Sequence, residues 1–428
     1  MKKPIFTALS PNSQPDDVWL ALKLICKPWR WKKGPASQKL QQTLHEFLRG
    51  EKNNGTDKQI FLFESGRTAL YTLLSALNLQ SDDEVLLQAY TCVAVPEPIL
   101  WAGAKPVYVD IDAKTLNMAP FDLEKKISPR SKVLIIQHTF GQPANLKELL
   151  TIARRHQLFI IEDCAHSLGS LYEGKKVGTF ADASFYSFGR DKVISAVFGG
   201  ALSVNDQKLR QKIHEQHENY TFPSRSWIVQ QLIHPVILGI AKATYSLYLG
   251  KLILKVSRSL KILSKAVYAE EKKGEKPPFI QKKLPNALAM LALHQFKKID
   301  SYNRHRQAIA KIYEKGLTKI PVELPPQTSQ EPSQAIYLRY CIKTPNAKEI
   351  LEKAKRQNIY LGDWYTTGIA PEGVNYQKIL YNPNTCPVAE QVAKQSLNLP
   401  TNIHITSNDA ERIIQFLKNF YGTTDSRN

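Results

Sequence analysis

Between residues 60 and 205, short apolar runs alternate with helix-like segments, and this alternation limits the possible folds more than any other feature. It is typical of a parallel sheet whose strands are joined by crossover helices. Helices are expected at Arg67–Leu79 and Leu146–His156, and Asn145 with Glu148 three residues later forms a capping signature for the second. The pattern predicts an α/β fold with a mainly parallel central sheet, formed by strands at 60–63, 84–89, 106–110, 133–137, 158–162, 184–188 and 200–204.

Composition divides the chain into four parts. We expect an N-terminal segment over 1–34, a large α/β domain over 35–218, a basic and apolar helical insertion over 219–281, and a long helix with a small α/β domain over 282–428. In the last part the pattern predicts a long helix over Pro285–Leu317, a strand at Ala335–Lys343, and helices at Ala347–Gln357 and Asn408–Phe420.

Two of the expected strands lead to residues that carry chemistry. The strand at 158–162 runs into Asp163, and the strand at 184–188 is followed by Lys192. Ligands of open α/β sheets lie beyond the carboxyl ends of the strands, so both side chains are expected at one crevice. Pyridoxal phosphate (PLP) needs such a pair, a lysine that carries it as a Schiff base and a carboxylate that keeps its pyridine nitrogen protonated. Each residue alone also has a simpler interpretation. Asp163 could cap the end of a strand, and Lys192 could be a solvated lysine in a loop.

A turn of small residues, Glu64–Leu70, joins the first expected strand to a helix. Helix N-termini offer free amide donors to a phosphate. Gly66 and Arg67, with the hydroxyl of Ser187, are therefore candidates to hold the cofactor's phosphate. A tight strand-to-helix turn without a ligand is the alternative.

The order of motifs resembles the DegT/DnrJ/StrS family of sugar aminotransferases over residues 35–215 and 280–420. The matching residues are Ser65-Gly66, Thr68-Ala69-Leu70, Gly103–Asp112, Asn117, His138, Gly141, Glu162-Asp163, His166, Gly169, Tyr172, Gly174-Lys175, Gly178, Asp182, Ser187-Phe188, Lys192, Gly199-Gly200, Leu288–Asp300, Cys386-Pro387, Ala389-Glu390 and Leu397–Pro400.

The resemblance implies a fold-type-I PLP-dependent transferase in which Lys192 and Asp163 are catalytic. His166 is expected beside the phenolic oxygen of the cofactor, and Lys283 at a position that reaches the phosphate of the partner subunit in a homodimer. The cofactor-binding residues implied in this way are Gly66, Arg67, Thr68, Tyr90, Asp163, His166, Ser187, Lys192 and Lys283.

The chain departs from the family pattern at three positions. Arg67 stands where Thr is common, and Phe198 replaces an acidic residue before the Gly-Gly pair. Cys92 occupies the place of the aromatic residue that stacks on the cofactor, and whether Cys92 or the nearby Tyr90 faces the ring stays open.

The family's reaction moves an amino group from an amino acid, glutamate or glutamine, to a keto sugar attached to a nucleotide, in glycan or amino-sugar biosynthesis. Two other functions are considered, a PLP-dependent sugar dehydratase and a non-catalytic regulatory or scaffold protein. The dehydratases replace the lysine with histidine, so Lys192 argues against that reading. Trp364 and Tyr365 are expected either in a sugar pocket or in the domain interface.

A net charge of +20 suits a polyanionic partner. Since no nucleic-acid-binding module accompanies it, no nucleic-acid partner is expected. A nucleotide sugar is the favoured polyanion, with Arg190 and Lys175 as candidate phosphate contacts. The five widely spaced cysteines include no C-x-x-C pair, so we expect reduced thiols, no metal site and a cytoplasmic location, and no export signal is recognised.

Residues 219–269 contain seven Lys or Arg and no Asp or Glu. We expect 228–268 to be a helical insertion that contacts a membrane surface or a lipid-linked partner. Gln230, Gln231, His234, Pro235 and Lys242 argue against a transmembrane span over Ile228–Leu249. At helical spacing one face carries Lys251, Lys255, Arg258, Lys261 and Lys265, and the opposite face Leu249, Ile253, Val256, Leu260, Leu263 and Val267. Packing of this apolar face on the dimer or on the large domain is the alternative.

Overall fold

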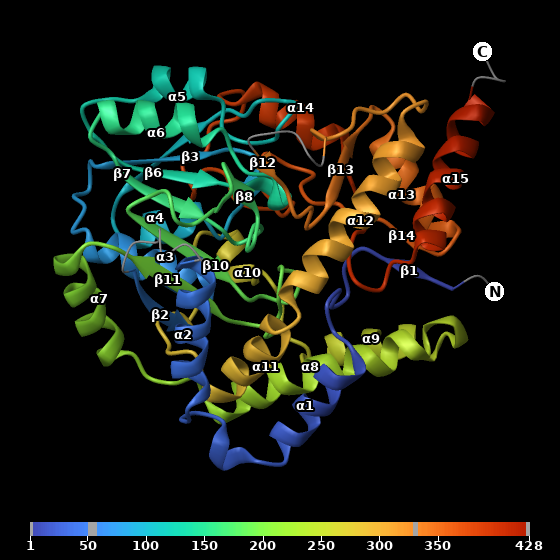
Figure 1. The fold of residues 1–428 in the computed structure, drawn as a ribbon, viewed down its shortest axis with the longest axis horizontal. Coiled ribbons are helices and arrows are strands. Elements are labelled where there is room, and N and C mark those ends of the chain that lie inside the picture. Colours follow the sequence, from blue (N-terminus) through green and yellow to red (C-terminus); the bar gives the residue numbers. More distant parts are fainter. Residues whose placement is uncertain (1–2, 50–57, 328–332, 425–428) are drawn as a thin grey trace.

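The large domain is built on a seven-stranded sheet with the strand order β2-β11-β10-β7-β6-β3-β5 (Figure 1). The computed structural model describes residues 3–49, 58–327 and 333–424. Strand β11 is antiparallel to both neighbours, and the other pairs are parallel. The predicted parallel sheet is confirmed, with strands β2 (Gln59–Phe63), β3 (Glu84–Gln88), β5 (Lys105–Val109), β6 (Ser131–Gln137), β7 (Phe159–Asp163), β10 (Ala183–Ser187) and β11 (Gly200–Val204).

Helices cover both faces of this sheet, which explains why its strands are almost continuously apolar. Leu86 and Leu134 belong to the core on one face, whereas Val85 and Ile135 belong to the core on the other. The first face is covered by α2 (Ala36–Arg49), α5 (Pro120–Lys126), α6 (Leu146–Arg155) and α11 (Asn286–Phe296), and the second by α3 (Gly66–Ala76), α4 (Pro96–Trp101) and α7 (Gln207–Asn219).

The small domain has its own core and includes part of the N-terminal segment. Strand β1 (Ile5–Phe6) pairs with β14 (Ile359–Tyr360), and β13 (Tyr340–Lys343) pairs with β16 (Ser396–Leu399). Its helices are α12 (Ile299–Leu317), α13 (Ala347–Arg356), α14 (Pro387–Gln395) and α15 (Ser407–Thr424). Short pairs complete the fold: β4 (Thr91–Cys92) with β15 (Ile369–Ala370), and β8 (Leu171–Tyr172) with β9 (Lys175–Lys176) and β12 (Ser333–Gln334).

Two predictions in this half need correction. The segment Pro285–Leu317 is not one helix, because the helical path breaks at Lys297 and Lys298 between α11 and α12. The strand predicted at Ala335–Lys343 begins only at Tyr340, since Tyr337 has a positive φ of 51° and turns the chain before the strand.

The insertion forms α8 (Arg225–Ala243), a turn η3 (Tyr245–Leu247), α9 (Leu249–Ser259) and the short α10 (Ala269–Lys272). Helix α1 (Pro15–Ile25), which precedes the turn η1 (Pro28–Arg30), packs beside α8. The polar residues of α8 have intramolecular partners: Gln231 accepts from Ser264 Oγ, and Lys242 donates to the Ser10 carbonyl at 2.6 Å. Among the described residues there is no helix with the length and apolar character needed to cross a bilayer.

The amphipathic helix predicted to continue to Val267 ends at Ser259 instead. Lys261 adopts a left-handed conformation with φ 54°, and its N–H donates to the Arg258 carbonyl. The N–H of Ile262 donates to the Ser257 carbonyl, which completes a Schellman motif and stops the helix. Within α9 the predicted apolar face is not the face that packs on the protein, because Leu249, Val256 and Leu260 are exposed whereas Gly250, Leu254 and Ser257 are buried.

Candidate active site

Lys192 lies in a loop that follows β10, and its backbone is held from two distant parts of the chain. Asn12 Nδ2 donates to the carbonyls of Lys192 at 2.6 Å and Val193 at 3.0 Å. The buried Arg306 on α12 donates to the same Val193 carbonyl at 2.7 Å. The N-terminal segment and the small domain therefore fix the position from which the lysine side chain extends.

The Lys192 amine is largely enclosed and has no hydrogen-bond partner within the described segments. Burial lowers its pKa, an effect that the charge of Arg339 reinforces and that Cys92 and Asp163 oppose. Its Nζ lies 5.3 Å from the centre of the Trp364 ring. A lowered pKa favours the neutral amine, which is the nucleophilic form.

Asp163 ends β7, which lies beside β10 in the sheet, and it is close enough to Lys192 for the two charges to interact. One carboxylate oxygen accepts from the Ala165 N–H at 2.9 Å. Burial raises the Asp163 pKa, and the Ala165 N–H and the Lys192 charge oppose this rise. A cationic ring nitrogen would be a favourable partner for this buried carboxylate.

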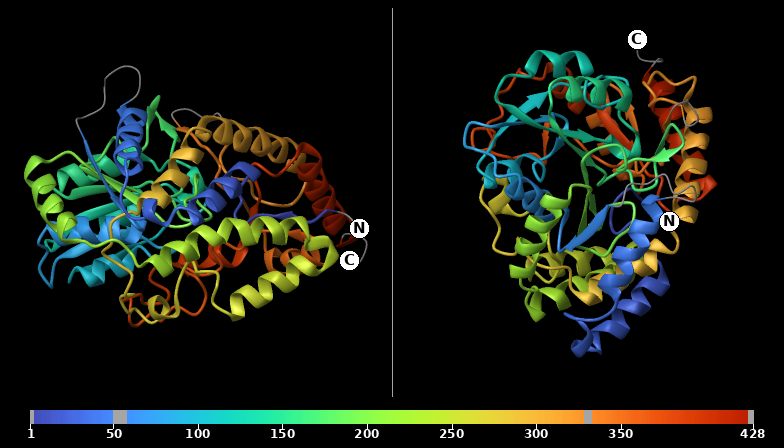
Figure 2. Two further views of the ribbon diagram at one scale, coloured as in Figure 1. Left: turned by 90° about the horizontal axis from the view of Figure 1, so that it is seen from below. Right: turned by 60° about the vertical axis from the view of Figure 1, so that its left-hand side comes forward.

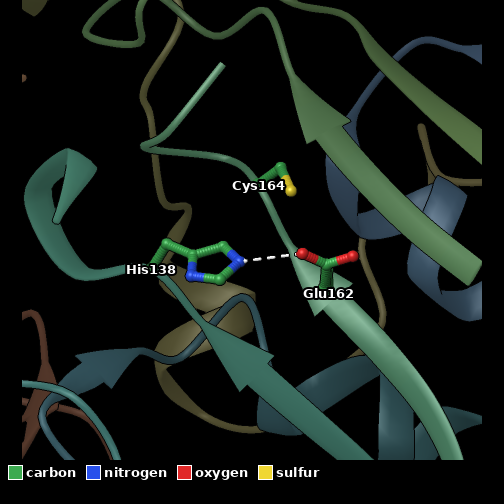
Figure 3. Close-up of side chains that lie close together, drawn as sticks. All are labelled: His138, Glu162 and Cys164. Atoms are coloured by element: carbon green, nitrogen blue, oxygen red, sulfur yellow. Dashed lines mark hydrogen bonds and ion pairs between the residues drawn. The ribbon is translucent and has the colours of Figure 1, made fainter. Parts of the chain in front are cut away.

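Behind Asp163 lies a buried cluster of His138, Glu162 and Cys164, shown in Figure 3. His138 Nδ1 accepts from the Ala144 N–H, so its Nε2 carries the proton and donates to Glu162 at 3.2 Å. Glu162 also accepts from the N–H groups of residues 178, 180 and 181. Burial pushes the Glu162 pKa up, but the interaction with His138, the charge of Lys58 and the Gly178 N–H together outweigh it, and the pKa falls below its usual value. With these bonds the cluster acts as a brace for the end of β7.

His166 lies near Lys192 and is neutral. Burial lowers its pKa well below the usual value, and the charges of Lys192 and Arg339 add to this effect. Its ring stacks between Phe140 and Trp364, and its Nδ1 accepts from the Phe140 N–H. The tautomer thus assigned carries its proton on Nε2, which can donate to a ligand oxygen.

The start of α3 offers free donors to a phosphate. Ser65 caps the helix by accepting from the Thr68 N–H at 3.2 Å, while in the described part of the chain the N–H groups of Gly66 and Arg67 have no partner. A Cβ on Gly66 would lie 3.2 Å from the Ser187 Cβ, so the turn packs directly against the residue predicted to add a hydroxyl. The free amides and the adjacent hydroxyl fit a phosphate group.

Two side chains predicted at the phosphate are engaged within the protein. Arg67 forms a buried ion pair with Glu271 of α10 and donates to the Ala266 carbonyl at 3.0 Å. The Thr68 hydroxyl donates to Glu64. The side chains of Arg67 and Thr68 are therefore already bonded within the protein, and the backbone amides at the start of α3 are the groups that can bind a phosphate.

Tyr90, Cys92 and Trp364 are the candidates for the residue that faces the cofactor ring. Tyr90 is fully buried, and its hydroxyl donates to Ser396 at 2.7 Å. Cys92 is partly exposed, and burial raises the pKa of its thiol although the nearby Lys192 opposes this rise. Trp364, which stacks on His166 with ring centres 5.6 Å apart, is the aromatic ring beside the lysine.

Arg339 was missed by sequence reasoning. Its side chain is 3% exposed, its guanidinium lies 5.1 Å from the centre of the Trp364 ring, and it donates to the Thr7 carbonyl. No acidic residue in the described segments forms an ion pair with it. A single Arg inside an apolar stretch matches no motif. The only indication in the sequence is a charged residue at a position where a core residue is expected.

Lys283 and Arg190 make contacts within their own chain. Lys283 Nζ lies 3.1 Å from Glu218, and its backbone bridges to Phe63 at the end of β2, just before α3. Arg190 donates to Ser264 of the insertion. Lys175 is exposed on β9.

The chain is similar to known proteins over most of its length. The model of the DegT/DnrJ/EryC1/StrS aminotransferase family matches residues 19–244 and 251–418. The spore coat polysaccharide biosynthesis protein SpsC of Bacillus subtilis is 26% identical over 400 residues, which are 92% of this chain and 91% of SpsC. The UDP-N-acetyl-3-dehydro-alpha-D-glucosamine 3-aminotransferase of Acidithiobacillus ferrooxidans is 26% identical over 339 residues, or 78% of this chain and 77% of that protein.

A solved structure has the same fold. Spr1654 from Streptococcus pneumoniae in its PLP form superimposes with a TM-score of 0.73 and 18% identity over 98% of each chain.

Proposed function

The chain belongs to the DegT/DnrJ/EryC1/StrS aminotransferase family, and from this premise we propose that it moves an amino group from glutamate or glutamine to a keto sugar carried on a nucleotide. It is a PLP-dependent sugar aminotransferase of amino-sugar biosynthesis. The similarity to an aminotransferase that acts on a UDP-linked sugar supports a nucleotide-linked acceptor. The net charge of +20 would draw such a polyanion toward the protein.

One observation carries the proposal: a partly buried lysine with a lowered pKa and a buried carboxylate lie within electrostatic reach at neighbouring strand ends. A lowered pKa increases the share of neutral amine, and a neutral amine can form a bond to a carbonyl carbon and move protons between atoms. When bound, PLP supplies the conjugated ring that takes up the electrons released from the donor's α-carbon.

The residues of the chain have distinct tasks in this proposal. Asp163 would hold the ring nitrogen, and the Nε2 proton of His166 would bond to the phenolic oxygen. The amides of Gly66 and Arg67, with the Ser187 hydroxyl, would bind the phosphate. Thr68 and Tyr90 would support the site without direct bonds to the cofactor. The Thr68 N–H fixes the start of α3 through its bond to Ser65, and the Tyr90 ring packs on Tyr365 with ring centres 5.4 Å apart.

Arg339 and Trp364 would recognise substrates. Arg339 is a buried cation without an acidic partner in the described structure, and such a group favours an anionic ligand. We assign it to a substrate anion such as the carboxylate of the amino donor. Trp364 lies over both Lys192 and Arg339, where a sugar or the cofactor ring would contact it.

The enzyme is further proposed to be a cytoplasmic homodimer with composite active sites. Lys283, which is 19% exposed and lies beside the end of β2, would then reach the phosphate of the partner subunit. The ion pair with Glu218 would have to open, which costs little because Glu218 is exposed.

Single-turnover spectroscopy tests the proposed reaction. The absorption band of bound PLP should shift when glutamate or glutamine is added, and it should return when the correct nucleotide keto sugar is added. A panel with UDP, GDP and dTDP carriers identifies the acceptor. If donors change the spectrum but no keto sugar restores it, the sugar acceptor is wrong; if no donor changes it, transamination itself is wrong.

A further inference from the structure

Helix α9 carries an apolar stripe that no part of the described chain covers. Leu249, Leu252, Val256 and Leu260 are between 44% and 66% exposed, and their spacing of three, four and four residues places them on one side of the helix. Leu247 and Tyr248, just before the helix, are 73% and 65% exposed. Figures 1 and 2 show α9 at the periphery of the molecule, beside α8 and away from the central sheet.

The stripe is separate from the face by which α9 packs on its own protein. Gly250, Leu254 and Ser257 form the buried face, and Leu254 belongs to a small core with Leu238 and Ala241 of α8. A Cβ on Gly250 would lie only 2.0 Å from the Ala241 carbonyl oxygen, so the two helices are in close backbone contact. Rotating α9 to bury the stripe would break this contact.

Basic residues occupy the side of α9 that faces away from both the stripe and the buried face. This side of α9 carries Lys251, Lys255 and Arg258. Two more basic residues, Lys261 and Lys265, follow the helix, and all five are exposed. None of them forms an ion pair within the described residues, and no acidic residue occurs between residues 219 and 269. Lys251 Nζ lies 4.5 Å from the centre of the Tyr248 ring, which holds a cation next to an exposed aromatic group.

An apolar groove continues from this region. Its volume is about 720 Å³, and it is lined by residues of the N-terminal segment, α1, α8 and the start of α15, including Trp19, Leu22, Ile240 and Asp409. The groove reaches Ser246, one residue before the exposed Leu247, and Lys3 and Lys242 also line it. Exposed apolar side chains therefore extend beyond α9 and are again accompanied by lysines.

We propose that α9 lies flat on an anionic lipid bilayer, with the stripe in the boundary between headgroups and acyl chains and the basic residues at the lipid phosphates. A helix with a charged side and an apolar side binds such an interface in this way. A second copy of the chain is a poorer occupant, because two basic surfaces without acidic residues would face each other. The proposal is independent of the sugar substrate.

Vesicle co-sedimentation of the full-length, PLP-loaded protein tests the proposal, with vesicles of phosphatidylcholine alone or mixed with phosphatidylglycerol. Wild type should bind the anionic vesicles at low salt and dissociate at high salt. The triple variant Lys251→Gln/Lys255→Gln/Arg258→Gln should bind roughly a hundredfold more weakly. The variant Leu252→Ser/Val256→Ser/Leu260→Ser changes only exposed side chains and should bind at least about tenfold more weakly.

Lys311→Gln/Lys315→Gln/Lys319→Gln, which removes the same charge from exposed positions at the end of α12, is the matched control and should bind like wild type. Equal weakening by this control would show non-specific charge attraction and overturn the proposal, as would no binding by wild type at low salt. If the serine variant instead turns a dimer into a monomer in light scattering, the stripe is a subunit interface and the membrane proposal is wrong.

Discussion

The cofactor-binding sheet and the insertion both consist largely of apolar residues, but they use them in opposite ways. In β6 and β11 the apolar side chains are buried, and the neighbouring strands β7 and β10 place Asp163 and Lys192 at one edge of the same sheet. In α9 the buried side includes small residues, and larger apolar side chains face outward. The comparison teaches that apolar sequence alone does not indicate burial, because close helix contacts can use Gly and Ser instead.

The largest difference between the cofactor-binding sheet and α9 is expected in the transamination rate of variants. Lys192→Ala should reduce transamination to below about one ten-thousandth of the wild-type rate, because no amine remains to bond the cofactor and move protons. Asp163→Asn should reduce it about 10²- to 10³-fold while the cofactor stays attached. Lys255→Ala on α9 should leave kcat unchanged with a soluble substrate. An Asp163→Asn enzyme with wild-type kcat would remove Asp163 from its proposed role.

The next largest effect is expected where the two regions meet. The Arg67–Glu271 ion pair links α3 to α10 and is buried on both sides. Glu271→Gln leaves Arg67 as an unpaired buried charge, so the free energy of unfolding should fall by about 3–5 kcal/mol. Glu270→Gln, at the adjacent exposed position, should change it by less than about 0.5 kcal/mol. Equal effects of the two substitutions in denaturant titrations would contradict the observed pairing.

One substitution made in both regions sharpens the comparison. Leu134→Ala in β6 should lower the free energy of unfolding by about 2–5 kcal/mol, because it leaves a cavity in the core. Leu252→Ala in the α9 stripe should change it by less than about 0.5 kcal/mol. If the Leu252 variant lost as much stability as the Leu134 variant, the stripe would be buried in solution.

A smaller effect should depend on pH. Glu64 is buried where the chain returns from the insertion at Lys282, and burial raises its pKa to about 7. Between these two pKa values the folded protein keeps the Glu64 proton, whereas the unfolded chain releases it. The stabilisation of the folded state by this proton is therefore full below pH 4.5 and is lost as the pH rises through 7. Between pH 5 and 8, wild type should lose roughly 2–3 kcal/mol relative to Glu64→Gln in unfolding titrations. Parallel pH profiles of the two proteins would exclude this protonation.

The sheet and its strand ends could be predicted because they depend on local patterns. Apolar runs of four to seven residues, separated by helical segments, identify parallel strands with little ambiguity, and Asp163 and Lys192 are at or just after such strands. Ser65 and Gly66 were predictable for the same reason, since a small-residue turn before a helix is a local signal.

The remaining features depend on contacts between distant residues. The end of α9 at Ser259 follows from the left-handed conformation of Lys261, which no Gly marks in the sequence. The pairing of Arg67 with Glu271 requires the insertion to fold back over α3, and the position of Arg339 beside Lys192 requires the two domains to meet. None of these follows from the spacing of residue types.

Borohydride reduction of the PLP-loaded protein, followed by peptide mass mapping, tests the central claim most directly. Reduction makes the bond between the cofactor and its lysine permanent, so the modified peptide identifies the lysine. The account predicts one pyridoxyl group per chain on Lys192, and none in Lys192→Ala. A stoichiometric label on another lysine, such as Lys58 or Lys283, would contradict it.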